Sequence, residues 1–188
     1  MIVRATAEGI SRRAPSNGGR ILTRTWMIAG ACMATCFAAA SHAQIARVKS
    51  NPNAVILDAA KVSAGAETLY ISGQLPSPID PAKSMADIKS IEDLGDTKTQ
   101  TISVLTKIKA ILESQGYTMQ DLVKLSLFVA PDPKLGKLDF MGANEGFKMF
   151  FGTAENPTTV ARSTFQVGAL VGPYFLIEIE AIAAKKPK

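Results

Sequence analysis

The chain has 188 residues, a length that suits one or two domains, and 47% of them are hydrophobic and 20% charged. Its one histidine, His42, and its two cysteines, Cys32 and Cys36, all lie before residue 44. The remainder therefore cannot build a Ser-His or Cys-His nucleophilic site, and a zinc or copper site there would have only carboxylate ligands. We predict no metal and no cofactor.

Residues 1–43 have the three parts of a secretory signal peptide. Five arginines and an apolar run over residues 26–40 precede Ser41-His42-Ala43, a small-x-small cleavage site. An uncleaved membrane anchor is the alternative, but a run of about 15 residues is short of the roughly 20 that span a bilayer. We predict a periplasmic or secreted protein with no membrane association after removal of the leader.

The leader also accounts for most of the formal net charge of +5. Of 21 basic and 16 acidic residues, five arginines and one glutamate lie in residues 1–43, so 16 basic and 15 acidic residues remain in residues 44–188. Residues 44–188 are therefore nearly neutral and contain no basic stripe, so their charge gives no support to nucleic-acid binding.

Residues 44–188 predict a single α+β domain, which begins with two strands. Residues 44–53 are polar and indicate a loose lead-in, and residues 54–57 predict a short first strand. Residues 67–73 are rich in β-formers and predict the second strand. Prolines at 76, 78 and 81 then indicate a turn-rich loop that continues to Gly95.

Two helices are predicted after this loop, with a strand over residues 122–130 between them. The first runs from a cap at Asp96 or Thr97 to about residue 115, and Gly116 is placed to end it. The second covers about residues 137–151. Its aromatic stripe is interpreted as core packing rather than a cofactor site; it consists of Phe140, Phe147, Phe150 and Phe151.

Two final strands, over residues 163–170 and 175–183, flank a Val-Gly-Pro turn and predict a β-hairpin. The order ββαβαββ then indicates a mixed sheet with both helices packed on one face. In the last strand Glu178, Glu180 and Ile182 point away from the apolar face. Leu176 points the same way, so this second face is half apolar, and Leu125 or Phe128 on a neighbouring strand adds to it. Such a face predicts self-association in a small ring.

Arg162 and Glu178 are the candidate site residues, and the predicted hairpin places them on neighbouring strands. A guanidinium can hold a carboxylate through two hydrogen bonds, and a glutamate beside it can act as a general base. The alternative is a structural ion pair between Arg162 and Glu178 or Glu180.

Five motifs in order resemble the Rid family of reactive-intermediate deaminases, also called YjgF-type proteins. They start at Leu69 (Leu-Tyr-Ile-Ser-Gly-Gln), Val123 (Val-Lys-Leu-Ser-Leu-Phe-Val), Asn144 (Asn-Glu-Gly-Phe-Lys-Met-Phe-Phe), Ala161 (Ala-Arg-Ser) and Ile177 (Ile-Glu-Ile-Glu-Ala-Ile-Ala). The resemblance covers about residues 54–184. It implies a chorismate-mutase-like (ferredoxin-like) α+β fold and a homotrimer with sites between subunits. It also implies cofactor-free hydrolysis of small 2-imino and enamine acids to 2-keto acids and ammonia.

The resemblance also assigns roles to residues. Arg162 matches the arginine that holds the substrate carboxylate, and Glu178 matches the acidic residue that activates water. Ser72 and Gly73 match positions that line the pocket, and Asn144 matches an asparagine near the site. Thr164 stands where many members have a cysteine, so regulation through a thiol is not expected.

One departure from the family pattern keeps a second function open. Many members carry a Gly-Pro-Tyr motif whose tyrosine faces the substrate, and the corresponding residues 54–60 contain no tyrosine. The alternative is a non-catalytic trimer that binds a small carboxylate or a partner protein. Endoribonuclease activity, known for some relatives, is disfavoured by the near-neutral charge of residues 44–188.

Overall fold

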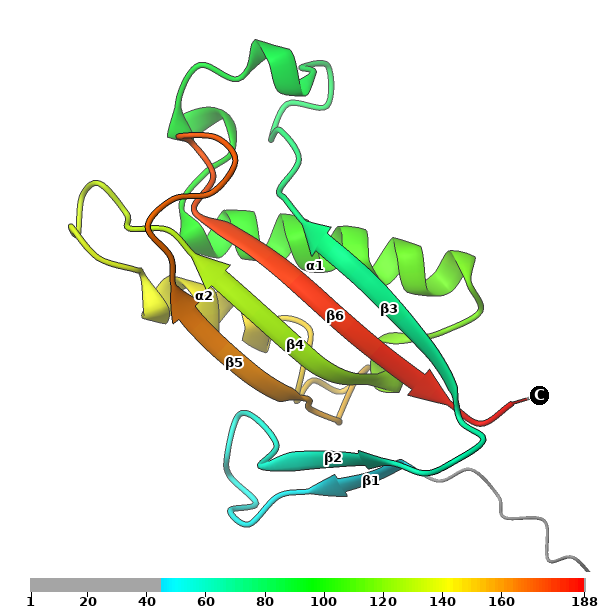
Figure 1. The fold of residues 1–188 in the computed structure, drawn as a ribbon. Coiled ribbons are helices and arrows are strands. Elements are labelled where there is room, and N and C mark those ends of the chain that lie inside the picture. Colours follow the sequence, from blue (N-terminus) through cyan, green and yellow to red (C-terminus); the bar gives the residue numbers. More distant parts are fainter. Residues whose placement is uncertain (1–44, 188) are drawn as a thin grey trace, which may run out of the picture. The chain divides into compact units, whose positions relative to one another are not determined.

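The computed structural model describes residues 45–187, so the predicted signal peptide in residues 1–43 lies outside the described part. Two helices, α1 and α2, and six strands make up its main elements (Figure 1). The helices are α1 (Thr97–Ser114) and α2 (Phe140–Lys148). The strands are β1 (Ile45–Val48), β2 (Ala59–Val62), β3 (Glu67–Gln74), β4 (Leu122–Val129), β5 (Ala161–Gln166) and β6 (Ile177–Lys185).

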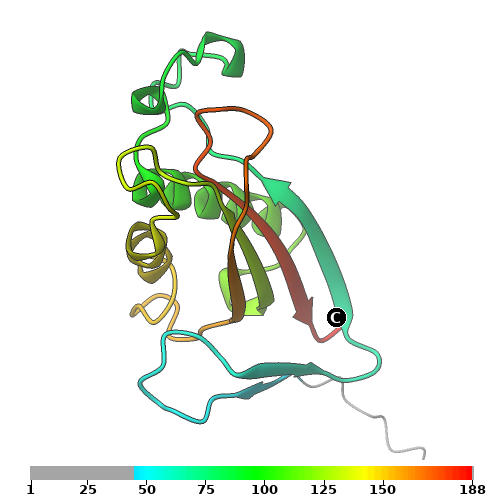
Figure 2. The same cartoon turned by 60° about the vertical axis from the view of Figure 1, so that its left-hand side comes forward.

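The main sheet has the strand order β3-β6-β4-β5. Strand β6 runs antiparallel to β3 and β4, while β5 is parallel to β4 and forms an edge. Both helices lie on the same side of this sheet, and the other side carries none (Figure 2). The predicted α+β architecture, a mixed sheet with two helices on one face, is confirmed.

The core lies between the helices and the inward-facing residues of the sheet. Alternation along β4 and β6 buries every second side chain, as expected for a sheet covered on one face. The apolar face of α1 meets this layer through Leu105, Ile108 and Leu112, none of which is exposed. Helix α1 begins as predicted, because the Asp96 carboxylate accepts a hydrogen bond from the Thr99 amide at 2.8 Å. Gly116 follows its end with a φ of +71°.

The predicted β-hairpin of the last two strands is wrong. Strands β5 and β6 do not pair with each other, because β4 lies between them and pairs with both. A hairpin pattern identifies two strands and a turn, but the strand that enters between them comes from a distant part of the sequence. Strand β4 therefore separates Arg162 from Glu178, although the sequence predicted the two residues on neighbouring strands.

The amino-terminal region also differs from the prediction. Residues 54–57 form no strand: only Leu57 makes an isolated bridge, parallel to Ala161. Residues in the expected lead-in instead form β1, which pairs antiparallel with β2 in a separate two-stranded sheet. The side chain of Arg47 holds this hairpin to the main sheet through the carbonyl oxygen of Leu122 at 2.9 Å. The apolar run was too short to distinguish a strand from a buried loop.

Helix α2 is shorter than predicted and is only partly a core helix. It begins at Phe140 because the Asp139 carboxylate caps it by accepting the Gly142 amide at 2.8 Å. Phe147 and Phe151 are buried and stack with ring centroids 4.4 Å apart. Phe140 is 46% exposed, so the interpretation of the whole aromatic stripe as core fails at this residue.

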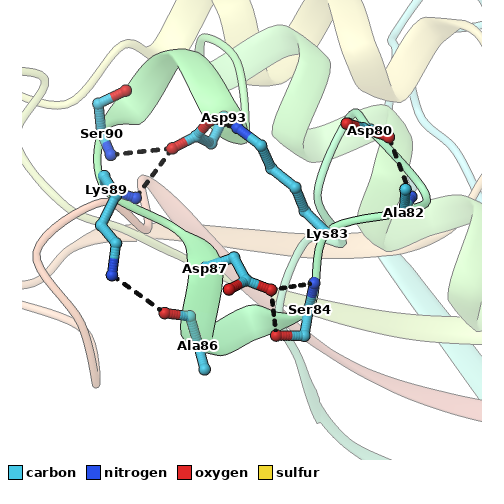
Figure 3. Close-up of polar contacts among 9 residues, drawn as sticks. All are labelled: Asp80, Ala82, Lys83, Ser84, Ala86, Asp87, Lys89, Ser90 and Asp93. Carbon is cyan, nitrogen blue, oxygen red and sulfur yellow. Dashed lines mark hydrogen bonds and ion pairs between the residues drawn. The ribbon is translucent and has the colours of Figure 1, made fainter.

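The loop between β3 and α1 is organised by its own carboxylates (Figure 3). Asp87 accepts from the amide and the hydroxyl of Ser84, and Asp93 accepts from the Lys89 amide at 2.8 Å. Lys83 forms an ion pair with Asp93. These contacts lower the pKa of Asp93 to about 2, and the hydrogen bond from Lys83 is the largest cause.

Candidate functional site

Arg162 lies near the start of the edge strand β5 and points to the helix side of the sheet. Its β4 partner is Leu125, a fully buried core residue, which identifies this face. The guanidinium donates through Nη2 to the Asn144 side-chain oxygen at 2.6 Å. Its Cζ also lies 4.5 Å from the centroid of the Phe147 ring and 5.9 Å from that of Phe140. Helix α2 therefore supplies both an acceptor and aromatic rings to Arg162.

The guanidinium of Arg162 is incompletely satisfied. Its Nε and Nη1 atoms are buried and have no hydrogen-bond partner among residues 45–187, and the salt bridges of this region do not include Arg162. Burial lowers the pKa of Arg162, because desolvation disfavours the charged form, yet an arginine remains protonated at neutral pH. Buried unpaired donors are costly, so this group is suited to receive an anion such as a carboxylate.

Glu178 lies near the start of β6 on the opposite, helix-free face. Its partner in β4 is Phe128, whose ring stacks on Phe165 at a centroid distance of 6.0 Å. The carboxylate lies against Gly73, and a β-carbon built there would lie 1.8 Å from Oε1 of Glu178. Only a glycine at position 73 leaves room for the Glu178 carboxylate where it lies. The β3–β6 register shifts between Ile71 and Gln74, so Ser72 and Gly73 lie at an irregularity beside Glu178.

Within one chain, Arg162 and Glu178 do not form a single site. They are separated by β4, and their β4 partners, Leu125 and Phe128, are three residues apart. Three residues along a strand and two strand spacings place the two backbones about 14 Å apart. Their side chains also project from opposite faces of the sheet.

The predicted site residues therefore fall into two groups. Asn144 and Thr164 lie with Arg162 on the helix side, Thr164 opposite the buried Leu127. These three form the arginine group. Ser72, Gly73 and Glu178 form the glutamate group, in which Ser72 is exposed. Each group is consistent with part of a binding site, and neither contains both an anion-binding group and a general base.

Sequence reasoning missed the aromatic partners of Arg162. Phe140, Asn144 and Phe147 are spaced by four and three residues, which puts them on one face of α2. This spacing was available in the sequence, but a stripe of phenylalanines also matches a core helix. Only the position of β5 beneath α2 shows that two of these rings flank an arginine.

Among residues 45–187, no cluster of three or more His, Cys, Asp or Glu side chains is arranged to hold a metal ion. Both helices and the short 3₁₀ turns of the same region fail to reach the length and apolar character that a bilayer crossing requires.

Comparisons with known proteins agree with this architecture. Residues 49–185 match the sequence model of a family described as Endoribonuclease L-PSP. A RutC family protein of Pyrococcus horikoshii is 39% identical over 118 residues, which are 63% of this chain and 79% of the relative. A 2-iminobutanoate/2-iminopropanoate deaminase of Escherichia coli K12 is 35% identical over 118 residues, 63% of this chain and 80% of that enzyme.

A solved structure also resembles the chain. A Rid-family protein of Yersinia pestis superposes with a TM-score of 0.53 at 27% identity, covering 74% of this chain and 98% of that one. The family model matches residues 49–185, which are nearly all of the described residues. The chain is a member of the Rid (YjgF-type) family.

Proposed function

We propose that the protein is a cofactor-free deaminase that hydrolyses small 2-imino acids, and their enamine tautomers, to 2-keto acids and ammonia. The observation that carries this proposal is the pair of buried, unpaired nitrogens on Arg162. A 2-imino acid has a planar carboxylate that a guanidinium holds in one orientation. The identity with a 2-iminobutanoate/2-iminopropanoate deaminase supports the same substrate class.

The reaction requires one bound water and one proton acceptor. Glu178 takes a proton from the water as its oxygen attacks the C=N carbon, and it passes that proton to the imine nitrogen to give a tetrahedral carbinolamine. Glu178 then takes the proton of the new hydroxyl and delivers it to the amine as the C–N bond breaks, which leaves a ketone and ammonia. In the overall reaction, one imino acid and one water are converted to one keto acid and one ammonia. Holding the carboxylate beside the water supplies the orientation that this addition needs.

We further propose that Arg162 of one subunit and Glu178 of another complete each site in a homotrimer. Because the two side chains project from opposite faces of one sheet, a second copy is the simplest way to bring them together. The helix-free face offers an interface, since Tyr70 is 75% and Phe165 50% exposed there. We also retain the proposal that residues 1–43 direct export.

A non-catalytic binding protein is the second candidate. It is favoured by the absence of tyrosine from residues 54–60, the segment that corresponds to the family's Gly-Pro-Tyr motif. Such a protein would use Arg162 to bind a carboxylate without turnover.

Ammonia release from 2-iminopropionate, generated in situ, separates the two candidates. For the deaminase, the purified protein exceeds the uncatalysed rate, Arg162→Ala abolishes the activity, and Glu178→Gln lowers kcat by about 10² to 10⁴. Glu178→Gln leaves affinity for the product pyruvate nearly unchanged, which shows that the variant is folded. A wild-type rate equal to background, with pyruvate bound and lost in Arg162→Ala, would identify the binding protein instead.

A further inference from the structure

An apolar hollow lies at the amino-terminal end of α2, beside the arginine group. Its volume is about 330 Å³. It is lined by Leu135, Lys137, Leu138, Asp139, Phe140 and Met141. Three of these apolar side chains are solvent-exposed: Leu135 at 51%, Phe140 at 46% and Met141 at 64%. The two charged residues at the hollow, Lys137 and Asp139, have opposite signs, so it carries no net charge.

This hollow adjoins the arginine group. Phe140 connects the two, because it lines the hollow and its ring centroid lies 5.9 Å from Cζ of Arg162. A second contact ties the hollow to the same strand: the amide of Leu138 donates to the Gln166 side-chain oxygen at 2.9 Å, and Gln166 ends β5 four residues after Arg162. A ligand whose carboxylate reached Arg162 would therefore have apolar surface beside it on the Phe140 side.

We infer that this hollow receives the side chain of the 2-imino acid whose carboxylate binds Arg162, and that Phe140 determines specificity. The inference rests on the proposed function and narrows its substrate class to imino acids with a sizeable apolar side chain, such as that of leucine. The volume falls at the small end of ligand sites, which span about 300–1,000 Å³. An apolar lining without net charge favours an uncharged hydrocarbon group over a polar one.

The kinetic test compares imines generated in situ from leucine and from alanine by an amino-acid oxidase. The wild type is expected to favour the leucine imine in kcat/KM by about tenfold or more, as apolar pockets do for added methylenes. Phe140→Ala removes most of this preference, because it lowers kcat/KM for the leucine imine more than for the alanine imine, and Phe140→Leu restores part of the preference. Met149→Ala is the matched control, because Met149 is 62% exposed just beyond α2 and does not line the hollow.

A binding measurement keeps the inference testable without turnover. Titration calorimetry with the keto acids 4-methyl-2-oxopentanoate and pyruvate is expected to show tighter binding of the larger acid, and loss of that preference in Phe140→Ala. Equal effects of Phe140→Ala on both ligands would overturn the inference and leave the deaminase proposal standing. A wild type that turns over neither imine would sink the deaminase proposal, and the ratio of keto-acid affinities would still decide the role of the hollow.

A second copy of the chain is the competing occupant. Molar mass from light scattering distinguishes it: Phe140→Ala should leave the oligomeric state unchanged. Dissociation of the assembly in this variant would identify the hollow as an interface between copies and overturn the inference.

Discussion

At the scale of single residues, Arg162 combines a stability cost with a capacity for binding. Its Nη2 is paired with Asn144, but Nε and Nη1 are buried without partners among the described residues. Each unsatisfied buried donor costs about 1–3 kcal/mol. A side chain that only stabilised the fold would not be expected to leave two such groups unpaired.

Arg162→Met tests this interpretation. Methionine has a similar reach and suits the surface formed by Phe147 and Phe140, so the free energy of unfolding should stay the same or rise. Affinity for keto acids should be lost. Thermal unfolding and calorimetry on the same samples measure both. A destabilisation above about 2 kcal/mol would instead indicate a structural role, as expected when removal of one hydrogen-bond partner leaves Asn144 unsatisfied.

Gly73→Ala tests the placement of Glu178. The added β-carbon would meet Oε1 of Glu178 at 1.8 Å, so the carboxylate must move, and the end of a flexible side chain can do so without unfolding the protein. We expect kcat to fall by about 10² to 10⁴, as for loss of a general base, with little change in keto-acid affinity or Tm. Gly168→Ala is the control, since nothing lies within 4 Å of the added carbon. Unchanged kcat in Gly73→Ala would argue against a catalytic Glu178.

At the scale of elements, the position of α2 over β5 depends on its close packing against α1. Gly146 of α2 faces Thr101 and the carbonyl oxygen of Lys98 in α1. Because α2 supplies Asn144 and both aromatic rings to Arg162, this contact also positions the arginine group.

Gly146→Ala should destabilise the protein even though alanine is the better helix former by about 1 kcal/mol. A β-carbon there would lie 2.7 Å from Cβ of Thr101 and 2.9 Å from the Lys98 carbonyl oxygen, so the helices must separate. We expect a net loss of about 1–3 kcal/mol in the free energy of unfolding, measured by urea denaturation. A stability equal to or above that of the wild type would show that the helix pair repacks freely.

The loop between β3 and α1 should loosen in acid. The pKa of Asp93 is lowered from 3.8 to about 2, so the contribution of its contacts is complete above about pH 4 and is lost as the pH falls through 2. Carboxyl-carbon NMR should give a midpoint near 2 for Asp93. In Lys83→Met, which removes the largest cause of the shift, the midpoint should rise toward the ordinary value. A wild-type midpoint near 4 would mean that the Lys83 contact is absent in solution.

At the scale of the whole molecule, the two groups of site residues face away from each other across one sheet. Strand β4 lies between β5 and β6 (Figure 1). The pairing of Arg162 with Leu125 and of Glu178 with Phe128 places the two residues on opposite faces of the sheet. The proposed deaminase would therefore need an assembly in which each subunit supplies one of the two groups to a site.

Mixing two inactive variants tests this arrangement. If each site takes Arg162 from one subunit and Glu178 from the next, co-refolding Arg162→Ala with Glu178→Gln creates some sites with both native residues. Random assembly of a closed ring predicts about a quarter of wild-type activity. Each variant refolded alone is the control. If mass measurement shows that mixed oligomers have formed and no activity is recovered, a site shared between subunits would be contradicted.

The sequence alone determined those features that depend on local patterns. Periodic apolar residues and the Asp96 cap predicted α1, β-branched runs predicted β3 and β4, and alternation in β6 correctly identified its buried face. Ordered motifs identified the family and supplied the predicted site residues. These features can be predicted from sequence because helix and strand periodicities depend on only a few neighbouring residues and not on the rest of the fold.

Only the tertiary structure decided how these elements meet. The hairpin prediction failed because a strand from forty residues earlier, β4, enters between β5 and β6, and no local pattern records such long-range pairing. The registers of β5 and β6 with β4 put Arg162 and Glu178 on opposite faces of the sheet. The position of α2 makes Phe140 a half-exposed neighbour of Arg162 rather than the core residue that its spacing predicted. Strand order is set by burial summed over the whole sheet, so the division of the site between two faces could be read only from the folded chain.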